Sequence, residues 1–472
     1  MKVIRKPIIP LKQTFYNREN KRIVLWRECK EMDLDYSAIA IFIAIGFMLD
    51  DDTFYDKIKV LKPASNNTIN KNKLIQQDKN WEWHYNPIER SIDTIVDEFS
   101  DLFESLISTK IQNKKIVLPL SGGLDSRTLL VPLKDHIKLV LFSYEFEGGY
   151  NENKFGQQIS SIKNWPFYAQ KISSGYLWKK IDLIANYNNC FTDFTHPRQI
   201  AVINQMQNLG DSLLLGHWGD VLFDKQSDCK GKSVCDQFLE LKLKLIKPGG
   251  LELASDLWEY WGLASSFEEY FDNRVLKMYE NIKIDHCSAR MRAFKSLYWA
   301  PRWTSINLSI FESAGNLILP YYDDEMLKFI CTVPERYLKN RKIQIEYIKK
   351  YYPQLAKVPL QKYYPLNLYN YDKYDYNYYL KKIIEKITRK IGKLFLIENE
   401  EIRRNWELQF LGSKNLIQLK KHLKASSRVK KIIPVNIIDK YLNKFQINPL
   451  KYAHAVSMLL TFIIFINKDI QE

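Results

Sequence analysis

A short segment of glycine, serine and aspartate has the residue types of a loop that binds phosphate. The segment Leu120-Ser121-Gly122-Gly123-Leu124-Asp125-Ser126 follows an apolar run. Its two glycines let backbone N–H groups approach an anion closely, and the hydroxyls of Ser121 and Ser126 supply further donors. Asp125 suits a phosphate site only where a cation lies between the two negative charges, and Mg²⁺ is often shared between a carboxylate and a phosphate. The segment therefore predicts a phosphate site that also holds Mg²⁺.

The elements that must position this loop alternate between short apolar runs and amphipathic stretches. Buried strands are predicted at residues 116–120, 138–146 and 212–215, and helices at 92–107, from Thr128 onward and at 152–162. Strands that alternate with helices indicate a parallel sheet with helical crossovers. From about residue 224 the pattern is mainly helical. We therefore predict an α/β fold, a parallel sheet with flanking helices and a helical C-terminal part.

The last long apolar stretch runs from Ala455 to Ile466 and is interrupted by Ser457 and Thr461. A membrane span needs about 20 apolar residues, so we predict a buried terminal helix and no membrane span. The N-terminal residues are not followed by an apolar stretch of signal-peptide length. The six cysteines contain no Cys-x-x-Cys pair and are interpreted as isolated thiols in a reducing compartment. The expected location is cytoplasmic.

The chain is basic, with 70 Lys and Arg against 54 Asp and Glu and a net charge of +16. This balance is compatible with nucleic acid, a membrane surface or acidic substrates, or with a compositional bias toward lysine, asparagine and isoleucine. No aromatic–basic RNA-binding motif accompanies the charge, so no specific nucleic-acid partner is predicted. The Lys-rich stretch from Tyr371 to Lys431 is predicted to form a solvated helical surface.

Three segments together resemble a known family. Ser-Gly-Gly-x-Asp-Ser after a strand resembles the signature of the PP-loop ATP pyrophosphatases, which cleave ATP to AMP and pyrophosphate. The segment from Gly216 to Phe223 resembles the Gly-Glu-Gly-x-Asp-Glu-Leu-Phe of the asparagine synthetase family. Leu319-Pro320-Tyr321-Tyr322-Asp323, with Val333-Pro334-Glu335 downstream, resembles that family's Pro-Phe-Leu-Asp region. The segments occur in the family's order, and the resemblance extends from about Ile92 to the C-terminus.

The resemblance implies ATP as the cofactor, with Mg²⁺ held by Asp125 and Asp220. It also implies that the nucleotide lies against Leu120, Ser121, Gly122, Gly123, Asp125, Ser126, Tyr144, Leu215 and Gly216. The family's catalytic lysine would be Lys362 or, less favoured, Lys357, with an ordinary surface lysine as the alternative. His217 stands where the family has Glu, either as a general base for an incoming amine or as a structural imidazole.

The N-terminal region departs from the family. Members that hydrolyse glutamine use a cysteine at position 2, and this chain has Lys2. Residues 45–63 nevertheless resemble the end of that glutaminase domain. We therefore expect residues 1–88 to be a truncated remnant of a glutamine amidotransferase domain and residues 89–472 to be an asparagine synthetase-like domain. Glutamine would not be the direct source of the amide, which leaves ammonia, an amine or a separate glutaminase as the supplier.

The region expected to bind the acceptor departs as well. The family's Glu-x-Arg-x-Pro becomes Asn316-Leu317-Ile318-Leu319-Pro320. Ile cannot replace an Arg that clamps a carboxylate, so free aspartate is not the expected substrate. We hypothesise an ATP-dependent carbon–nitrogen ligase that adenylates a small-molecule or peptide carboxylate and joins it to ammonia or an amine. The alternatives are a catalytically degenerate protein that binds ATP or a partner and, less favoured, a tRNA-modifying PP-loop enzyme.

Overall fold

The computed structural model describes residues 1–472 apart from 31, 137, 148–150, 374–408, 425 and 472. It contains a five-stranded parallel sheet with the order β11-β10-β7-β8-β9. The strands are β7 (Ile116–Pro119), β8 (Leu139–Phe146), β9 (Phe167–Ile172), β10 (Ser212–Leu214) and β11 (Asn316–Ile318). The chain proceeds from β7 to β9 in one direction and then continues on the other side of β7 with β10. At such a reversal the loops diverge and leave a crevice outside the carboxyl ends of the strands, where α/β sheets bind ligands.

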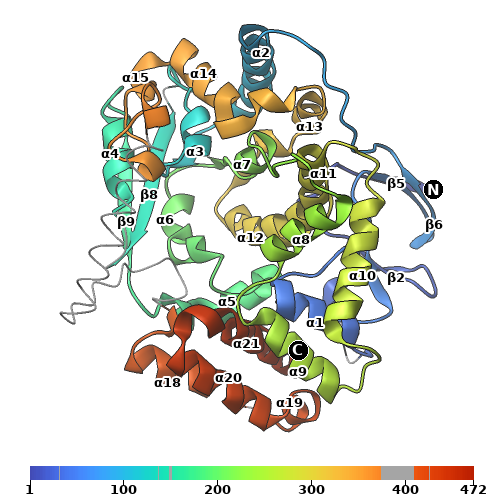
Figure 1. The fold of residues 1–472 in the computed structure, drawn as a ribbon. Helices are drawn as coiled ribbons and strands as arrows, with labels where there is room; N and C mark the ends of the chain where they lie inside the picture. Colours follow the sequence, from blue (N-terminus) through green and yellow to red (C-terminus); the bar gives the residue numbers. More distant parts are fainter. Residues whose placement is uncertain (31, 137, 148–150, 374–408, 425, 472) are drawn as a thin grey trace.

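Helices cover this sheet because its central strand β7 is apolar on both faces. Ile116, Val117 and Leu118 of β7 are at most 1% exposed. Helix α2 (Ile92–Ile111) packs against α14 (Lys342–Tyr351), and α4 (Asn153–Ser160) packs on β8 and β9 (Figure 1). The predicted α/β fold with a parallel sheet and flanking helices is confirmed.

Three local details differ from the sequence prediction. The outer strands β9 and β11 were not predicted, since β9 is a mostly exposed edge strand and β11 has only three residues. The helix expected to begin at Thr128 is instead α3 (Leu124–Thr128), which ends there. Pro132 lies shortly after α3 and disfavours helical backbone at the residue before it.

Beyond this sheet and residues 1–88, the described part of the chain is mainly helical, as predicted from about residue 224 onward. Its helices are α5 (Tyr176–Asn188), α6 (Ile203–Gln207), α7 (Gly219–Leu222), α8 (Val234–Leu245), α9 (Gly250–Tyr260), α10 (Phe267–Glu280), α11 (Cys287–Phe294), the π-helix η3 (Lys295–Thr304), α12 (Ser305–Leu308), α13 (Asp324–Ile330), α15 (Pro353–Ala356), α18 (Ser413–His422), α19 (Ser427–Ile432), α20 (Val435–Ile447) and α21 (Pro449–Gln471). Much of the Lys-rich stretch predicted to be helical lies outside the described residues.

Residues 1–88 form two small antiparallel sheets and one buried helix. One sheet has the order β1 (Lys2–Lys6), β5 (Ser65–Asn70), β6 (Lys73–Lys79), and the other β3 (Ile23–Val24), β2 (Phe15–Asn17), β4 (Ile58–Val60). Helix α1 (Tyr36–Ile45) is buried from Ala38 onward and packs against α9 and α21. A Cβ at Gly250 would lie 2.5 Å from the carbonyl oxygen of Ala44, so glycine permits the close approach of α9 to α1. This region shares its hydrophobic core with the rest of the chain, while its origin as a glutaminase remnant stays a prediction.

The C-terminal apolar run forms the buried helix α21, as expected. Residues Pro449–Lys468 are long and apolar enough to cross a membrane, yet 78% of the most apolar window is buried within the structure. Phe465 stacks on Phe54 of the N-terminal region, with ring centroids 3.8 Å apart. Helix α21 therefore packs as a core helix against the N-terminal region, residues 1–88.

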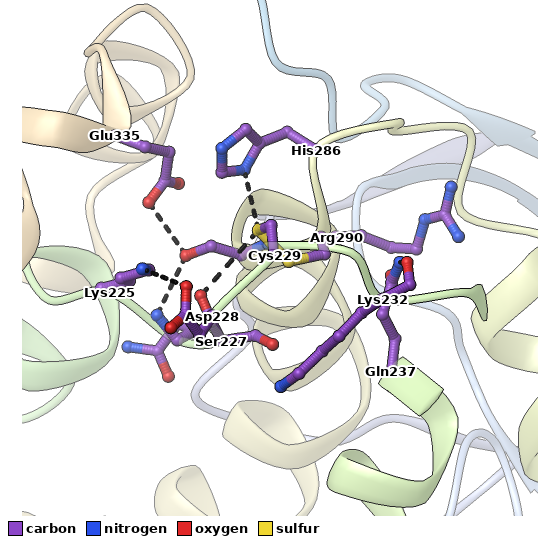
Figure 2. Close-up of a disulfide and its surroundings, with 12 residues drawn as sticks. Lys225, Ser227, Asp228, Cys229, Lys232, Gln237, His286, Arg290 and Glu335 are labelled. Atoms are coloured by element: carbon purple, nitrogen blue, oxygen red, sulfur yellow. Dashed lines mark hydrogen bonds and ion pairs between the residues drawn. A yellow bond between two sulfur atoms is a disulfide. The ribbon is translucent and has the colours of Figure 1, made fainter. Parts of the chain in front are cut away.

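The interpretation of the six cysteines as isolated thiols is wrong for two of them. Cys229, in the loop after α7, and Cys287, the first residue of α11, form a disulfide (Figure 2). Their separation of 58 residues gave no spacing signal in the sequence. Disulfides are rare in a reducing cytoplasm, so cysteine usage no longer supports the cytoplasmic location, which stays a prediction.

His454 of α21 makes stability sensitive to acid. Its Nε2 lies 2.9 Å from the carbonyl oxygen of Ile43 in α1, and burial lowers the pKa of the imidazole to about 4. Above pH 6.5, the ordinary histidine value, His454 is neutral in both states. As the pH falls from there toward 4, the unfolded chain takes up a proton that the folded chain excludes. We expect this group to lower the free energy of unfolding by about 3 kcal/mol across that window.

Denaturant titrations between about pH 7 and about pH 4.5 measure this dependence. The His454→Gln variant keeps an amide donor for Ile43 but does not titrate, so its stability should vary less with pH. An unchanged pH dependence in this variant would show that His454 is not responsible.

Candidate active site

A cavity of about 580 Å³ lies at the carboxyl ends of β7, β8 and β10, where the strand order reverses. A volume of this size is usual for small-molecule and cofactor sites. The predicted site residues that line it are Leu120, Ser121, Asp125, Ser126, Tyr144, Gly216, His217 and Asp220. The others, Gly122, Gly123, Leu215 and Lys362, do not line it. Motifs that are far apart in the sequence therefore meet at one cavity.

The loop after β7 is held in shape by its own serine side chains. The hydroxyl of Ser126 accepts a hydrogen bond from the N–H of Ser121 at 3.2 Å, and the two hydroxyls lie 3.2 Å apart. The hydroxyl of Ser121 also accepts from the N–H of Gly123 at 3.3 Å. Helix α3, which follows, has five residues, so its dipole is small. Affinity for an anion would come from the hydroxyls and from N–H groups that are not used within the loop, rather than from a long helix.

The segment after β10 lies directly on this loop because two of its residues are glycines. A Cβ at Gly216 would lie 3.0 Å from the backbone carbon of Asp125, and a Cβ at Gly219 would collide with Asp125 Oδ1. Trp218, between the two glycines, has a φ of 80°, a left-handed conformation that is rare for a residue with a side chain. This close contact places the acidic residue that follows, Asp220, beside Asp125.

Inside the protein the carboxylate of Asp125 is paired with a cation. Arg341 donates a hydrogen bond to Oδ1 of Asp125, and Nε2 of Gln344 donates to the same oxygen at 3.2 Å. Burial raises the pKa of Asp125, the charge of Arg341 opposes this shift, and the nearby charge of Asp220 adds to it. Arg341 itself has a φ of 63°, a conformation that costs energy and that surrounding contacts must maintain. The arginine thus compensates a carboxylate that burial alone would favour in its neutral form.

Asp125 and Asp220 are a donor set that fits Mg²⁺ arriving with a nucleotide. Both line the cavity, and in the described part of the chain the carboxylate of Asp220 has no hydrogen-bond or ion-pair partner. Mg²⁺ commonly uses one or two carboxylates and completes its coordination with water and phosphate oxygens. Among the described residues no group of three His, Cys, Asp or Glu side chains could hold a metal by itself. The site therefore suits a phosphate-bound ion better than a resident metal.

His217 reaches the cavity as a neutral imidazole. Its side chain is accessible to solvent in the cavity, and its ring packs edge-to-face on Phe311 with centroids 6.0 Å apart. Desolvation by the surrounding protein lowers the pKa of His217 to about 4, while Asp220 opposes the shift and Arg198 adds to it. At neutral pH the ring can therefore accept a hydrogen bond from a bound group.

The loop that carries Lys362 packs against the loop after β7. Arg127 of α3 is 0% exposed and donates to two carbonyl oxygens of residues 358–359, at 2.6 and 2.8 Å. Lys362 itself is exposed, and its Nζ lies 5.0 Å from the ring centroid of Tyr363. Lys362 thus belongs to a segment that packs against the loop after β7, but it does not line the cavity. Its catalytic role stays a prediction.

A lysine that the sequence analysis did not single out lies in the cavity wall. Lys295 begins η3, and its Nζ donates to Oε1 of Gln226 at 2.6 Å. Gln226 is fixed in turn, since its side-chain amide donates to the carbonyl oxygens of Val221 and Asp224 at 2.9 and 3.1 Å. Burial lowers the pKa of Lys295 to about 8, which still leaves it charged at neutral pH. No local pattern marks this residue apart from the aromatic-rich segment that it begins.

A second cation in the cavity was also missed. Arg198, the first residue of the short helix η2 (Arg198–Ala201), lines the cavity and hydrogen bonds to Tyr144. Although burial disfavours its charge, Tyr144 and Glu152 hold the pKa of Arg198 above its ordinary value. The described lining of the cavity therefore includes the cations Lys295 and Arg198 as well as carboxylates.

Comparison with known proteins gives little beyond this geometry. No family model matches the chain, and no curated protein matches it. Among solved structures, NMN synthetase from Francisella tularensis is similar over 44% of this chain and 93% of its own, with 10% sequence identity and a TM-score of 0.22. A TM-score this low supports no conclusion about function, and the resemblance to the asparagine synthetase family stays a prediction.

The pairing of Arg341 with Asp125 can be tested by removing its charge. Arg341→Met would leave Asp125 without a cation, and we expect the free energy of unfolding to fall by about 2 kcal/mol. This is less than the about 3–5 kcal/mol typical of a fully buried pair, because both side chains retain some exposure. Chemical denaturation measures the change.

The double variant Asp125→Asn with Arg341→Met isolates the interaction. It should be more stable than the sum of the single losses predicts, because a neutral amide needs no counter-ion. Strictly additive losses would show that the two side chains are not coupled.

Proposed function

We propose that this protein is an ATP-dependent carbon–nitrogen ligase of the asparagine synthetase type. It would activate a carboxylate as an acyl-adenylate and transfer the acyl group to ammonia or an amine. One observation carries the proposal: the loop Ser121–Ser126 and the segment Gly216–Asp220 meet on one cavity at the reversal of strand order. Adenylation uses hydrogen-bond donors that hold phosphate and carboxylates that hold Mg²⁺. Both kinds of group are next to each other here.

In the first step a carboxylate oxygen of the substrate attacks the α-phosphorus of ATP. A C–O–P bond forms, the bond between the α-phosphorus and the bridging oxygen breaks, and pyrophosphate leaves with the electron pair. The loop N–H groups and the hydroxyls of Ser121 and Ser126 would hold the phosphates. Mg²⁺ on Asp125 and Asp220 would supply neutralisation of the charge on pyrophosphate. Lys295, which also lines the cavity, would offset negative charge at the reacting centre.

In the second step the nitrogen of the amine attacks the acyl carbon. The C–O bond to phosphate breaks, AMP leaves, and the nitrogen gives up a proton. Because the pKa of His217 is held at about 4, this imidazole suits orientation of the amine by accepting a hydrogen bond. It is a weak base for storing the proton, since general bases work best with a pKa near the operating pH.

The surroundings of the cavity favour a substrate other than free aspartate. Ile318, which stands where the family has a carboxylate-clamping Arg, is 2% exposed in β11 and belongs to the hydrophobic core. Neither Ile318 nor Asn316 lines the cavity. In this proposal the nitrogen comes from free ammonia, an amine or a separate glutaminase partner.

A catalytically degenerate ATP-binding protein is the second candidate. The observation in its favour is that Arg341 already neutralises Asp125, which weakens the need for Mg²⁺ at that carboxylate. The carboxylate of Asp220, which has no partner among the described residues, and the cations Lys295 and Arg198 favour turnover instead. Pyrophosphate release distinguishes these candidates.

Asp125→Ala and Asp220→Ala test the shared role of the two carboxylates. Each should lower the rate of pyrophosphate release in the presence of a carboxylic acid substrate by on the order of 10²-fold or more. This is comparable to the loss of one strong electrostatic stabiliser. The double variant should be scarcely worse than either single one, because residues that serve the same ion lose one function together.

Asp101→Ala, at an exposed carboxylate of α2, is the matched control and should leave the rate unchanged. Thermal shifts with Mg–ATP, recorded on the same samples, report nucleotide binding, and Asp125→Ala should lose this shift. Multiplicative losses would mean that the carboxylates act independently. Wild-type protein that binds Mg–ATP but releases no pyrophosphate with any acid would favour the degenerate protein.

A further inference from the structure

One wall of the cavity is a stripe along the π-helix η3. Lys295, Trp299 and Trp303 occur at intervals of four residues, and all three line the cavity. A π-helix turns about every 4.4 residues, so such spacing keeps the three side chains on one side of the helix. Runs of π-helix are rare and are frequent at functional sites. The stripe has a charged end and an aromatic end.

The charged end lies next to the catalytic carboxylate. Gln226 accepts from Nζ of Lys295 at 2.6 Å and donates from Nε2 to the backbone oxygen of Asp220 at 3.3 Å. One glutamine therefore separates the ammonium group from the backbone of Asp220. In the described part of the chain Lys295 has no carboxylate within ion-pair distance, so its charge is left for a ligand.

The aromatic end is braced from the surrounding protein. Phe47 stacks on Trp299 with centroids 5.4 Å apart, and Nζ of Lys247 lies 4.9 Å from the centroid of the same ring. Trp303 packs edge-to-face with His196 at 5.0 Å. These contacts hold two indoles in place while both still line the cavity. Rigid, partly exposed aromatic faces bind flat groups with little loss of side-chain entropy.

We propose that the carboxylate substrate is carried on a ring, with its acid group at Lys295 and its ring against Trp299 and Trp303. This inference rests on the proposed ligase function, because adenylation requires the acid to lie near the phosphate loop and Asp220. The cations Lys295 and Arg198 select an anion over an amine ligand. An aryl acid and a uronic acid share this chemistry, a carboxylate attached to a ring, and the experiment separates them.

The test is calorimetric binding of individual acids to the full chain with Mg²⁺ and a non-hydrolysable ATP analogue. The panel contains benzoate and its hydroxy derivatives, glucuronate and galacturonate, and the ring-free acids aspartate, glutamate and succinate. A ring-bearing acid should bind more tightly than any ring-free one, and whether the aryl or the sugar acid does so identifies the source of the ring.

Variants of the stripe connect the binding to these residues. Trp303→Leu should weaken binding of the ring acid by about tenfold, whereas Trp303→Phe should retain most of the affinity because an aromatic ring remains. Lys295→Met should weaken it by about tenfold or more through loss of a charge-assisted hydrogen bond. Trp81→Phe and Lys277→Met change side chains that do not line this cavity; they are the matched controls and should have no effect.

The outcomes separate this inference from the proposed function. Tighter binding of ring-free acids, no binding of ring acids at millimolar concentration, or insensitivity to Trp303→Leu would each overturn the inference. Exchange of labelled pyrophosphate into ATP, measured with the same acids, tests the ligase. Exchange with ring-free acids alone would uphold the ligase and reject the ring. Stripe-dependent binding of a ring acid without exchange would uphold the ring-acid site and reject the ligase.

Discussion

The geometry of the site depends on backbone lying against backbone where the segment after β10 meets the loop after β7. Side chains at Gly216 or Gly219 would occupy the space now filled by Asp125. Protein interiors are close-packed, so a β-carbon there would push the two segments apart rather than be absorbed. The reversal of strand order brings the segments to the same edge of the sheet, and the glycines let them touch. The adjacency of Asp125 and Asp220 follows from both conditions together.

The negative charge of two adjacent carboxylates is compensated by residues from the helical layer. Asp125 accepts hydrogen bonds from Arg341 and Gln344, which lie at the start of α14. The same glutamine donates to the hydroxyl of Tyr321 at 2.8 Å, and Tyr321 is fully buried. The third sequence segment, Leu319–Asp323, is therefore joined to the phosphate loop through one amide. Since α14 also packs on α2, the orientation of the Asp125 carboxylate is tied to the main helical packing of the fold.

The sequence was informative where the signal is local. Apolar runs marked β7, β8 and β10, and glycines beside Ser and Asp marked the loops that end two of them. The edge strand β9 is half polar and β11 is three residues long, so neither has an apolar run that predicts a strand. Arg341 and Lys295 owe their positions to tertiary packing, and nothing in their neighbouring residues distinguishes them from other basic residues in so basic a chain. Lys362 was selected by its place along the chain, whereas the conformation of its loop leaves the side chain exposed.

The support behind Lys295 connects this lysine to the backbone of Asp220 and to the core. The backbone N–H of Gln226 donates to the hydroxyl of Ser288 at 2.9 Å, and that hydroxyl donates to Glu335 at 2.9 Å. The disulfide between Cys229 and Cys287, adjacent to Ser288, closes the same loop onto α11 (Figure 2). Gln226 is thus immobilised from the core while it touches both Lys295 and the backbone of Asp220. Lys295 and the backbone of Asp220 are consequently parts of one hydrogen-bonded unit, an arrangement that the proposed ligase could use to hold an acid near the loop after β7.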